Sequence, residues 1–170
     1  MNLAKRIKER IKEKEHKLDV NSIYQTSIHN VLAHSYSFYF VAFLFGIILD
    51  FVYPVQSFDI HSIQPLGLIL LAISTLLIHW AQRTSRNLKK EEISYKNFMV
   101  GPYKFSRMPT HLGIFILLLG FGIITNSFWV ILFSFISFFI TKMTFIKTEE
   151  KILEKKYGDP YLKYKNVVHL

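Results

Sequence analysis

A short polar segment, residues 101–113 with the sequence GPYKFSRMPTHLG, leads directly into an apolar run. Gly-Pro at its start favours a turn, and Pro109 suits the first turn of a helix, where its missing N–H costs nothing. Arg107 and His111 would then stand at a helix N-terminus, where free N–H groups and the helix dipole favour an anion. Because an arginine can hold a carboxylate through two parallel hydrogen bonds, the segment predicts a site for a carboxylate-bearing ligand.

A second polar group follows the last apolar run of the chain. Glu149 and Glu150 are adjacent carboxylates in a tail that is otherwise rich in lysine. Such carboxylates can bind an ammonium group, a ribose hydroxyl or a sulfonium-bearing ligand. A helix that runs through this tail must be interrupted at residues 158–160, Gly-Asp-Pro. Tyrosines at helical spacing, which could wall an adenine pocket, flank this interruption: Tyr157, Tyr161 and Tyr164.

Taken singly, each of these residues has an ordinary structural explanation. An arginine at a membrane surface usually anchors to phosphate, a glutamate pair usually begins a solvated helix, and aromatic residues near a bilayer usually form an interfacial belt. The chain has no cysteine, which excludes disulfides, thiolate metal sites and a cysteine nucleophile. The histidines match no metal spacing, and there is no Gly-rich phosphate loop or HExxH helix. We therefore expect no metal site.

Four apolar runs must position the polar segments: residues 36–55, 63–80, 112–125 and 128–146. The first two have about the 20 residues that a transmembrane helix needs. The third would span roughly 21 Å, less than the ~30 Å hydrocarbon core. It either begins earlier or forms with the fourth a hairpin whose tip stays within the outer leaflet. We expect an all-α, polytopic membrane protein with about four transmembrane helices, the last two a hairpin.

The basic residues are sorted between the two sides of these runs. Residues 1–35, 83–107 and 142–170 hold seven Lys and Arg each, which accounts for all 21, whereas the connections around 56–62 and 126–127 hold none. By the positive-inside rule, the N-terminus, the central loop and the C-terminus are cytoplasmic. We therefore expect a multi-pass integral membrane protein, in a bacterial inner membrane.

The net charge of +9 flanks apolar spans, so we expect anionic lipid headgroups and no nucleic acid as its partner. Near the N-terminus, Leu3, Ile7 and Ile11 form a narrow apolar stripe among charged residues. This segment is either an interfacial anchor on the inner leaflet or a solvated helical tail. The expected organisation is a basic amphipathic segment followed by the first two transmembrane helices and a catalytic core: residues 1–35, 36–82 and 83–170.

In combination, the two polar segments resemble a known family. They are similar to the membrane methyltransferases related to isoprenylcysteine carboxyl methyltransferase and phospholipid N-methyltransferase, whose motifs read roughly G-P-Y-x-x-x-R-H-P-x-Y-x-G and E-E-x-x-L-x-x-x-F-G-x-x-Y-x-x-Y. The first motif is matched at Gly101, Pro102, Tyr103, Arg107, Pro109 and Gly113. The second is matched at Glu149, Glu150, Leu153, Gly158, Tyr161 and Tyr164, with Tyr157 in place of Phe. The resemblance covers roughly residues 83–168.

Two departures from the first motif bear on the site. Met108 stands where the family usually has His, so a polar contact is lost there. His111 stands where the family usually has Tyr, and it keeps both a ring and a polar nitrogen. The proline often seen after the last valine is also absent, because the chain ends Val-Val-His-Leu.

The resemblance implies an enzyme that moves a methyl group from S-adenosylmethionine to a lipophilic small molecule or lipid at the cytoplasmic face. Arg107 and the helix N-terminus at Pro109 would hold the methionine carboxylate, and Glu149 and Glu150 would face the amino group or ribose. Tyr161, Tyr164 and His111 would enclose the adenine. The remaining cofactor-binding residues would be Tyr103 and Gly113, and the catalytic residues Arg107, His111 and Glu150.

The methyl acceptor stays open between a prenylated cysteine carboxylate, a phospholipid amine, and small hydrophobic amines or thiols. A carboxylate needs no base, whereas an amine must be deprotonated, and His111 could then serve. Gly113, Gly120 and Gly122 either leave a groove for the acceptor or serve helix packing alone, which we favour. The alternative functions are a membrane lipid or sterol reductase and a catalytically inactive scaffold of the same fold.

Overall fold

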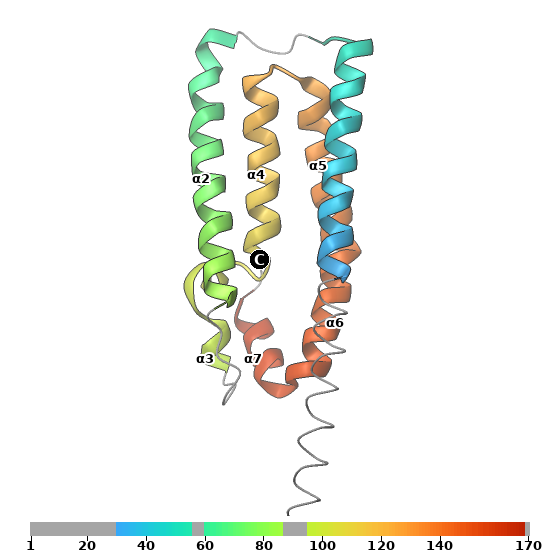
Figure 1. Ribbon diagram of the computed structural model, residues 1–170. Coiled ribbons are helices and arrows are strands. Elements are labelled where there is room, and N and C mark those ends of the chain that lie inside the picture. Colours follow the sequence, from blue (N-terminus) through green and yellow to red (C-terminus); the bar gives the residue numbers. More distant parts are fainter. Residues whose placement is uncertain (1–29, 56–59, 87–94, 169–170) are drawn as a thin grey trace, which may run out of the picture.

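The computed structural model describes residues 30–55, 60–86 and 95–168, and every regular element within them is a helix. The expected all-α fold is therefore confirmed. Long helices stand side by side in Figure 1: the first helix (Asn30–Val52), α2 (Ile60–Arg86), α4 (Pro109–Ile124) and α5 (Phe128–Met143).

The two ends of this bundle differ. At the end drawn uppermost in Figure 1, the first helix finishes, α2 begins, and a short turn joins α4 to α5. We call the opposite end, which carries the shorter elements, the polar end. Those elements are α3 (Tyr95–Phe98), η1 (Gly101–Lys104), α6 (Phe145–Tyr157) and α7 (Asp159–Val167).

Three of the described helices are long and apolar enough to cross a bilayer: Asn30–Val52, Ile63–Ser85 and Phe128–Tyr157. The fourth, α4, has only 16 residues, which reach about 24 Å and so fall short of the ~30 Å hydrocarbon core. α4 begins earlier than the third apolar run, at Pro109, which occupies the first turn as the sequence predicts. The protein is thus a polytopic helical membrane protein with three long helices and one shorter one.

Helix ends differ from the apolar runs where polar residues continue a helix or proline stops it. The first helix ends at Val52 rather than Val55, because Pro54 lacks an N–H and disfavours helical geometry in the residue before it. α2 continues past Trp80 to Arg86, so the residues that follow the apolar run are still helical.

The largest difference lies after the fourth apolar run. That run was expected to end near Ile146, with the two glutamates beyond it. Instead α5 passes into α6 at Thr144, and together they form a rod from Phe128 to Tyr157. The glutamates therefore sit on a helix that is anchored in the bundle. The rod ends where expected, because Gly158 has φ +61° before α7 begins.

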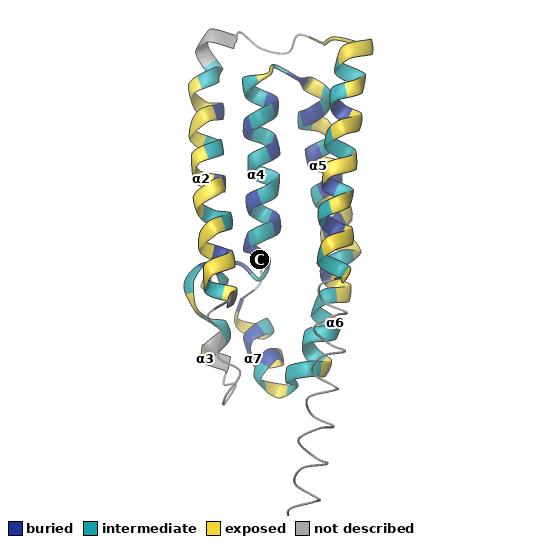
Figure 2. Cartoon of the chain, viewed as in Figure 1, coloured by how far each residue is buried: buried dark blue, intermediate teal, exposed yellow. Residues whose placement is uncertain are grey.

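Figure 2 shows that buried and exposed positions are separated on the helices of the bundle; many buried positions are small residues, and many large apolar residues are exposed. Phe51, Leu76 and Phe139 are exposed, whereas the buried positions include Ala81 and several serines. Ser74 and Ser137 satisfy their hydroxyls by donating to carbonyl oxygens one turn back in their own helices, Leu71 and Phe133. This inside-out pattern is typical of helices that pack closely in lipid.

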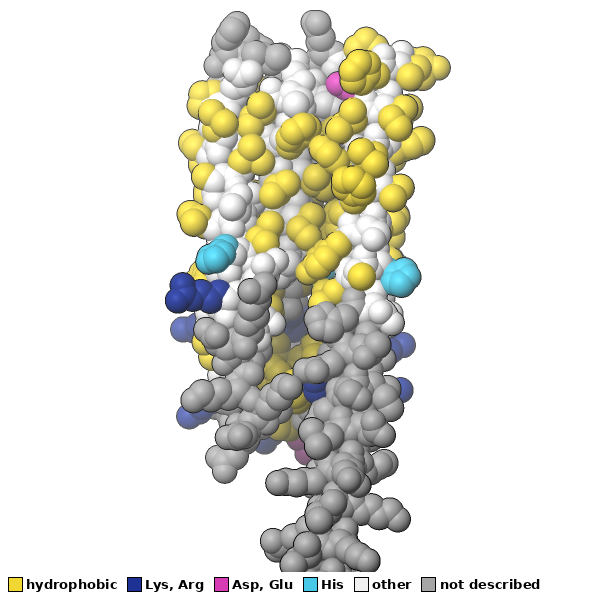
Figure 3. Space-filling model, in the orientation of Figure 1, with side chains coloured by type: hydrophobic (Ala, Val, Ile, Leu, Met, Phe, Trp, Pro, Cys, Tyr) yellow, Lys and Arg dark blue, Asp and Glu magenta, His cyan; other side chains and the backbone are white. Residues whose placement is uncertain are grey.

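Charge is concentrated at the polar end, as Figure 3 shows for one face. Above it the drawn face carries mainly hydrophobic side chains. Asp50 lies near the far end of the bundle, two residues before the first helix ends. The described Lys and Arg residues lie in the last turns of α2 and α5 or on the short elements and connections that follow them. The separation that the sequence shows along the chain is therefore also a separation in space.

Close packing of α2 on α4 depends on two facing glycines. A Cβ on Gly120 would lie 2.9 Å from the carbonyl oxygen of Gly67, and a Cβ on Gly67 would lie 2.9 Å from that of Gly120. Gly113 likewise faces Ile78 of α2, and Gly122 faces Ile131 of α5. The three α4 glycines therefore serve helix packing, which is the interpretation favoured from the sequence.

We expect Gly120→Val to separate α2 from α4 and to destabilise the bundle by about 1–3 kcal/mol, because backbone atoms cannot move aside. The measurement is the thermal unfolding midpoint of the detergent-purified protein. Leu68→Val is the matched control, since this α2 side chain is 61% exposed and touches little. Equal midpoints for the two variants would contradict the packing.

Candidate functional site

The chain leading into α4 is shaped by tight local contacts. Gly101 has φ +59°, and a Cβ there would lie 2.6 Å from the Thr84 hydroxyl of α2, so this turn requires glycine. The hydroxyl of Ser106 then accepts a hydrogen bond from the backbone N–H of Met108 at 3.1 Å. These contacts hold Arg107 directly before the N-terminus of α4, with the Met108 side chain buried beside it.

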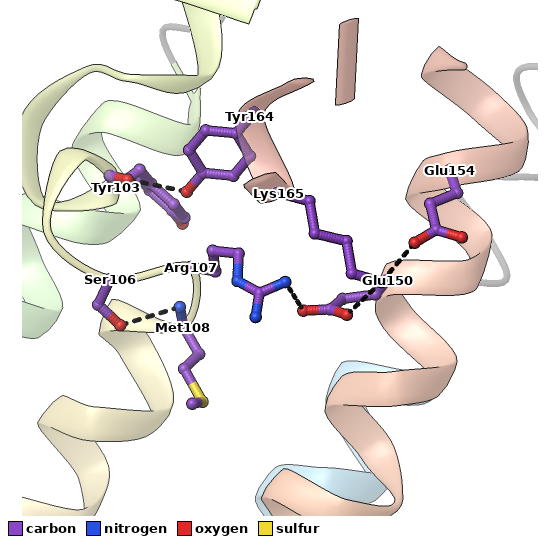
Figure 4. A network of polar contacts seen from close by, with 8 residues as sticks. All are labelled: Tyr103, Ser106, Arg107, Met108, Glu150, Glu154, Tyr164 and Lys165. Atoms are coloured by element: carbon purple, nitrogen blue, oxygen red, sulfur yellow. Dashed lines mark hydrogen bonds and ion pairs between the residues drawn. The ribbon is translucent and has the colours of Figure 1, made fainter. Parts of the chain in front are cut away.

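Arg107 meets Glu150 of α6 in an ion pair of 2.6 Å (Figure 4). The side chains are only 19% and 13% exposed, so water screens the pair weakly. The second oxygen of Glu150 lies 3.0 Å from the Lys165 ammonium of α7, which also contacts Glu154 at 2.6 Å. Both glutamates raise the pKa of Lys165 through hydrogen bonds, so it stays charged.

Glu149 points to a different partner from Glu150. Its carboxylate lies 3.8 Å from Nε2 of His111, which is only 3% exposed on the first turn of α4. Two tyrosines of the first helix flank the imidazole: the ring centroids of Tyr36 and Tyr39 lie 5.6 Å and 6.2 Å from it. The hydroxyl of Tyr36 also meets the side chain of Thr110.

α7 folds back onto the polar end and closes it from below. Its Tyr164 hydroxyl donates to the backbone carbonyl of Tyr103 at 2.8 Å (Figure 4). Tyr161 and Tyr164 are each 3% exposed, and both rings contact Phe98 of α3 at 5.6 Å. Burial raises the pKa of both tyrosines above the ordinary value. They stay neutral and dock α7 against the chain that precedes α4.

The structure brings most of the expected site residues to one place. Arg107 and Glu150 touch, His111 and Glu149 face each other, and Tyr103 is joined to Tyr164. Gly113 has other surroundings, because it lies against Ile78, one turn into α4. Tyr161 and Tyr164 lie together in the aromatic cluster of α7, and the charges of Glu150, Glu149 and Arg107 act on Tyr161. A cofactor-binding role for these residues remains a prediction.

Three residues that contact the expected site residues were not singled out from the sequence. Lys165 was counted only as part of a basic tail, yet it bridges Glu150 and Glu154. Tyr36 and Tyr39 begin the first apolar run, where they resemble an ordinary interfacial belt. Their spacing of three puts them on one helix face, but nothing local shows that this face meets His111.

Comparison with known proteins shows the family to which the chain belongs. Residues 63–160 match the sequence model of the phospholipid methyltransferase family. The match covers more than half of the chain and runs from α2 to the start of α7, leaving the first helix outside. The chain belongs to this family of membrane methyltransferases. No curated protein and no solved structure is significantly similar to it.

We expect Tyr164→Phe to loosen α7, because it removes one hydrogen bond worth about 0.5–1.5 kcal/mol while keeping the ring. The variant should be cleaved faster by trypsin after Lys163, with little change in the midpoint of global unfolding. Tyr157→Phe is the control, since its ring lies in the same cluster. Identical cleavage rates in both variants would show that the Tyr164 hydroxyl does not hold α7.

Proposed function

We propose that the protein is an S-adenosylmethionine-dependent methyltransferase that acts at the polar end of the bundle on a lipophilic acceptor. Family membership supports methyl transfer at a membrane. The observation that carries the cofactor assignment is the Arg107–Glu150 pair beside the N-terminus of α4. A bound cofactor would supply an activated methyl group on a sulfonium centre.

The charges at this place suit the amino-acid part of that cofactor. Its α-carboxylate and α-ammonium are a zwitterion, and Arg107 and Glu150 present one partner for each. Arg107 and the free N–H groups of α4 would hold the carboxylate. Glu150 would hold the ammonium, with Lys165 keeping its second oxygen fixed. Opening the existing ion pair to admit a zwitterion leaves no buried charge without a partner.

His111 is suited to prepare the acceptor. Within the described residues, neither of its ring nitrogens has a hydrogen-bond partner, although the side chain is buried. Glu149 at 3.8 Å would stabilise the protonated ring. His111 can therefore take a proton from an ammonium acceptor, which frees the lone pair on the acceptor nitrogen. A carboxylate acceptor would instead meet the negative charge of Glu149. We thus favour a lipophilic amine over an isoprenylcysteine carboxylate.

The polar end would face the cytoplasm by the positive-inside rule. Lys147, Lys151 and Lys155 are exposed on α6 and would meet anionic headgroups. A soluble cofactor can then arrive from the water side, while the acceptor arrives from the bilayer.

We expect Arg107→Ala and Glu150→Ala each to weaken S-adenosylmethionine binding at least ~10-fold, because each leaves one charge of the zwitterion unpaired. Isothermal titration calorimetry on the protein in nanodiscs measures this affinity. The exposed α7 residues Lys163 and Asp159 provide matched controls, Lys163→Ala and Asp159→Asn, which should bind like wild type. Saturable binding that none of the four substitutions alters would sink the assigned site.

We expect His111→Phe to lower kcat for amine acceptors by about 100-fold or more, because it removes the base and keeps a ring. The affinity for S-adenosylmethionine should not change. The readout is transfer of an isotopically labelled methyl group into lipid extracts, with the exposed His79→Phe as control. A parallel loss of cofactor affinity would assign His111 to the adenine pocket, and full activity would remove it from the site.

A further inference from the structure

An apolar groove of about 260 Å³ runs between the first helix and α4. These two helices lie side by side in Figure 1 and both lead away from the polar end. The walls are aromatic on one side and mostly aliphatic on the other. They are made by Tyr36, Tyr39, Phe40 and Phe43 of the first helix and by Ile114, Leu117, Leu118 and Phe121 of α4.

The groove comes close to His111, because its lining residues Tyr36 and Tyr39 also flank the imidazole. Positions 114, 118 and 121 continue the face of α4 on which His111 lies, because they follow it at helical spacing. At the far end, Phe43 and Phe121 meet edge to face with ring centroids 5.1 Å apart. From His111 to Phe121 the helix rises about 15 Å. The groove is therefore an apolar channel along α4 that starts near the imidazole.

Buried polar atoms gather where this channel begins. Tyr39 is 2% exposed, and its hydroxyl lies close to that of Thr141, a fully buried residue of α5. Within the described part of the chain, neither hydroxyl has a hydrogen-bond partner of ordinary geometry, and the same holds for the nitrogens of His111. Because unpaired buried polar groups are costly, a cluster contributed by three helices indicates a place for a polar ligand group.

We propose that the first helix and α4 form the acceptor site: one hydrocarbon chain of the methyl acceptor lies in the groove, and its headgroup is seated among Tyr39, Thr141 and His111. This proposal rests on the proposed function and specifies its second substrate. The volume is below the ~300–1,000 Å³ of pockets that enclose a drug-sized ligand, so the groove takes a single chain. Recognition of the acceptor then depends on the first helix, which lies outside the family match.

The test uses a long-chain alkylamine with a diazirine at its tail, photolysed in nanodiscs with wild-type protein. We expect labelling to concentrate on residues 36–43 and 114–121. Ile114→Trp fills the groove and should cut this labelling about tenfold. Leu132→Trp, on the exposed face of α5, is the matched control and should leave it unchanged. Labelling spread evenly over all lipid-facing helices would overturn the proposal.

S-adenosylmethionine affinity is measured on the same preparations, so the two proposals fail separately. Normal cofactor binding with labelling outside the groove removes the acceptor site and leaves the proposed function standing. A second variant, Tyr39→Phe, guards against misfolding, because it keeps the ring and removes only the hydroxyl. It should weaken probe binding while cofactor affinity stays at the wild-type value. Unchanged probe binding in Tyr39→Phe would remove the hydroxyl from the headgroup seat.

Discussion

The structure depends on one constraint: a guanidinium and a carboxylate that are largely removed from water at the end of an apolar bundle must form an ion pair, because burying either charge alone is costly. Arg107 precedes α4 and Glu150 lies on the rod formed by α5 and α6, so their ion pair joins the two ends of the α4–α5 hairpin. Lys165 extends the pair to α7 and fixes the tail beneath the bundle. The charges of the polar end are thus arranged around this contact, where we propose that a zwitterion binds.

The two adjacent glutamates face different partners at the polar end. Glu150 faces the charges that would hold the cofactor, while Glu149 faces His111 and the tyrosines of the first helix. In the proposed function, one helix turn therefore contacts both the cofactor and the acceptor. The segment that matches the phospholipid methyltransferase family holds Arg107 and Glu150, whereas Lys165 lies beyond it. The proposed acceptor site needs the first helix as well, because the groove has a wall on each of the two helices.

Local chemistry made much of this fold predictable. The apolar runs predicted the long helices, and the sorting of charges predicted the polar end. Pro109 marked the start of α4, and Gly158 marked the end of α6. Hydropathy could not show that α6 continues α5 through the glutamates. Hydropathy marks the apolar part of a helix, whereas the helix itself can continue into water through polar residues. The tyrosine contacts with His111 and the bridge made by Lys165 join positions distant in sequence. Such contacts depend on how helices pack, and no spacing along the chain encodes them.

We propose that the approach to α4 and the helix beyond α5 bind one cofactor molecule together. Ultraviolet cross-linking of radiolabelled S-adenosylmethionine to the membrane-embedded protein, followed by peptide mapping, tests it most directly. We expect label in peptides from both residues 101–113 and residues 145–165, displaced by excess unlabelled S-adenosylhomocysteine. Displaceable label confined to the first helix or α2, with neither of those segments modified, would contradict it.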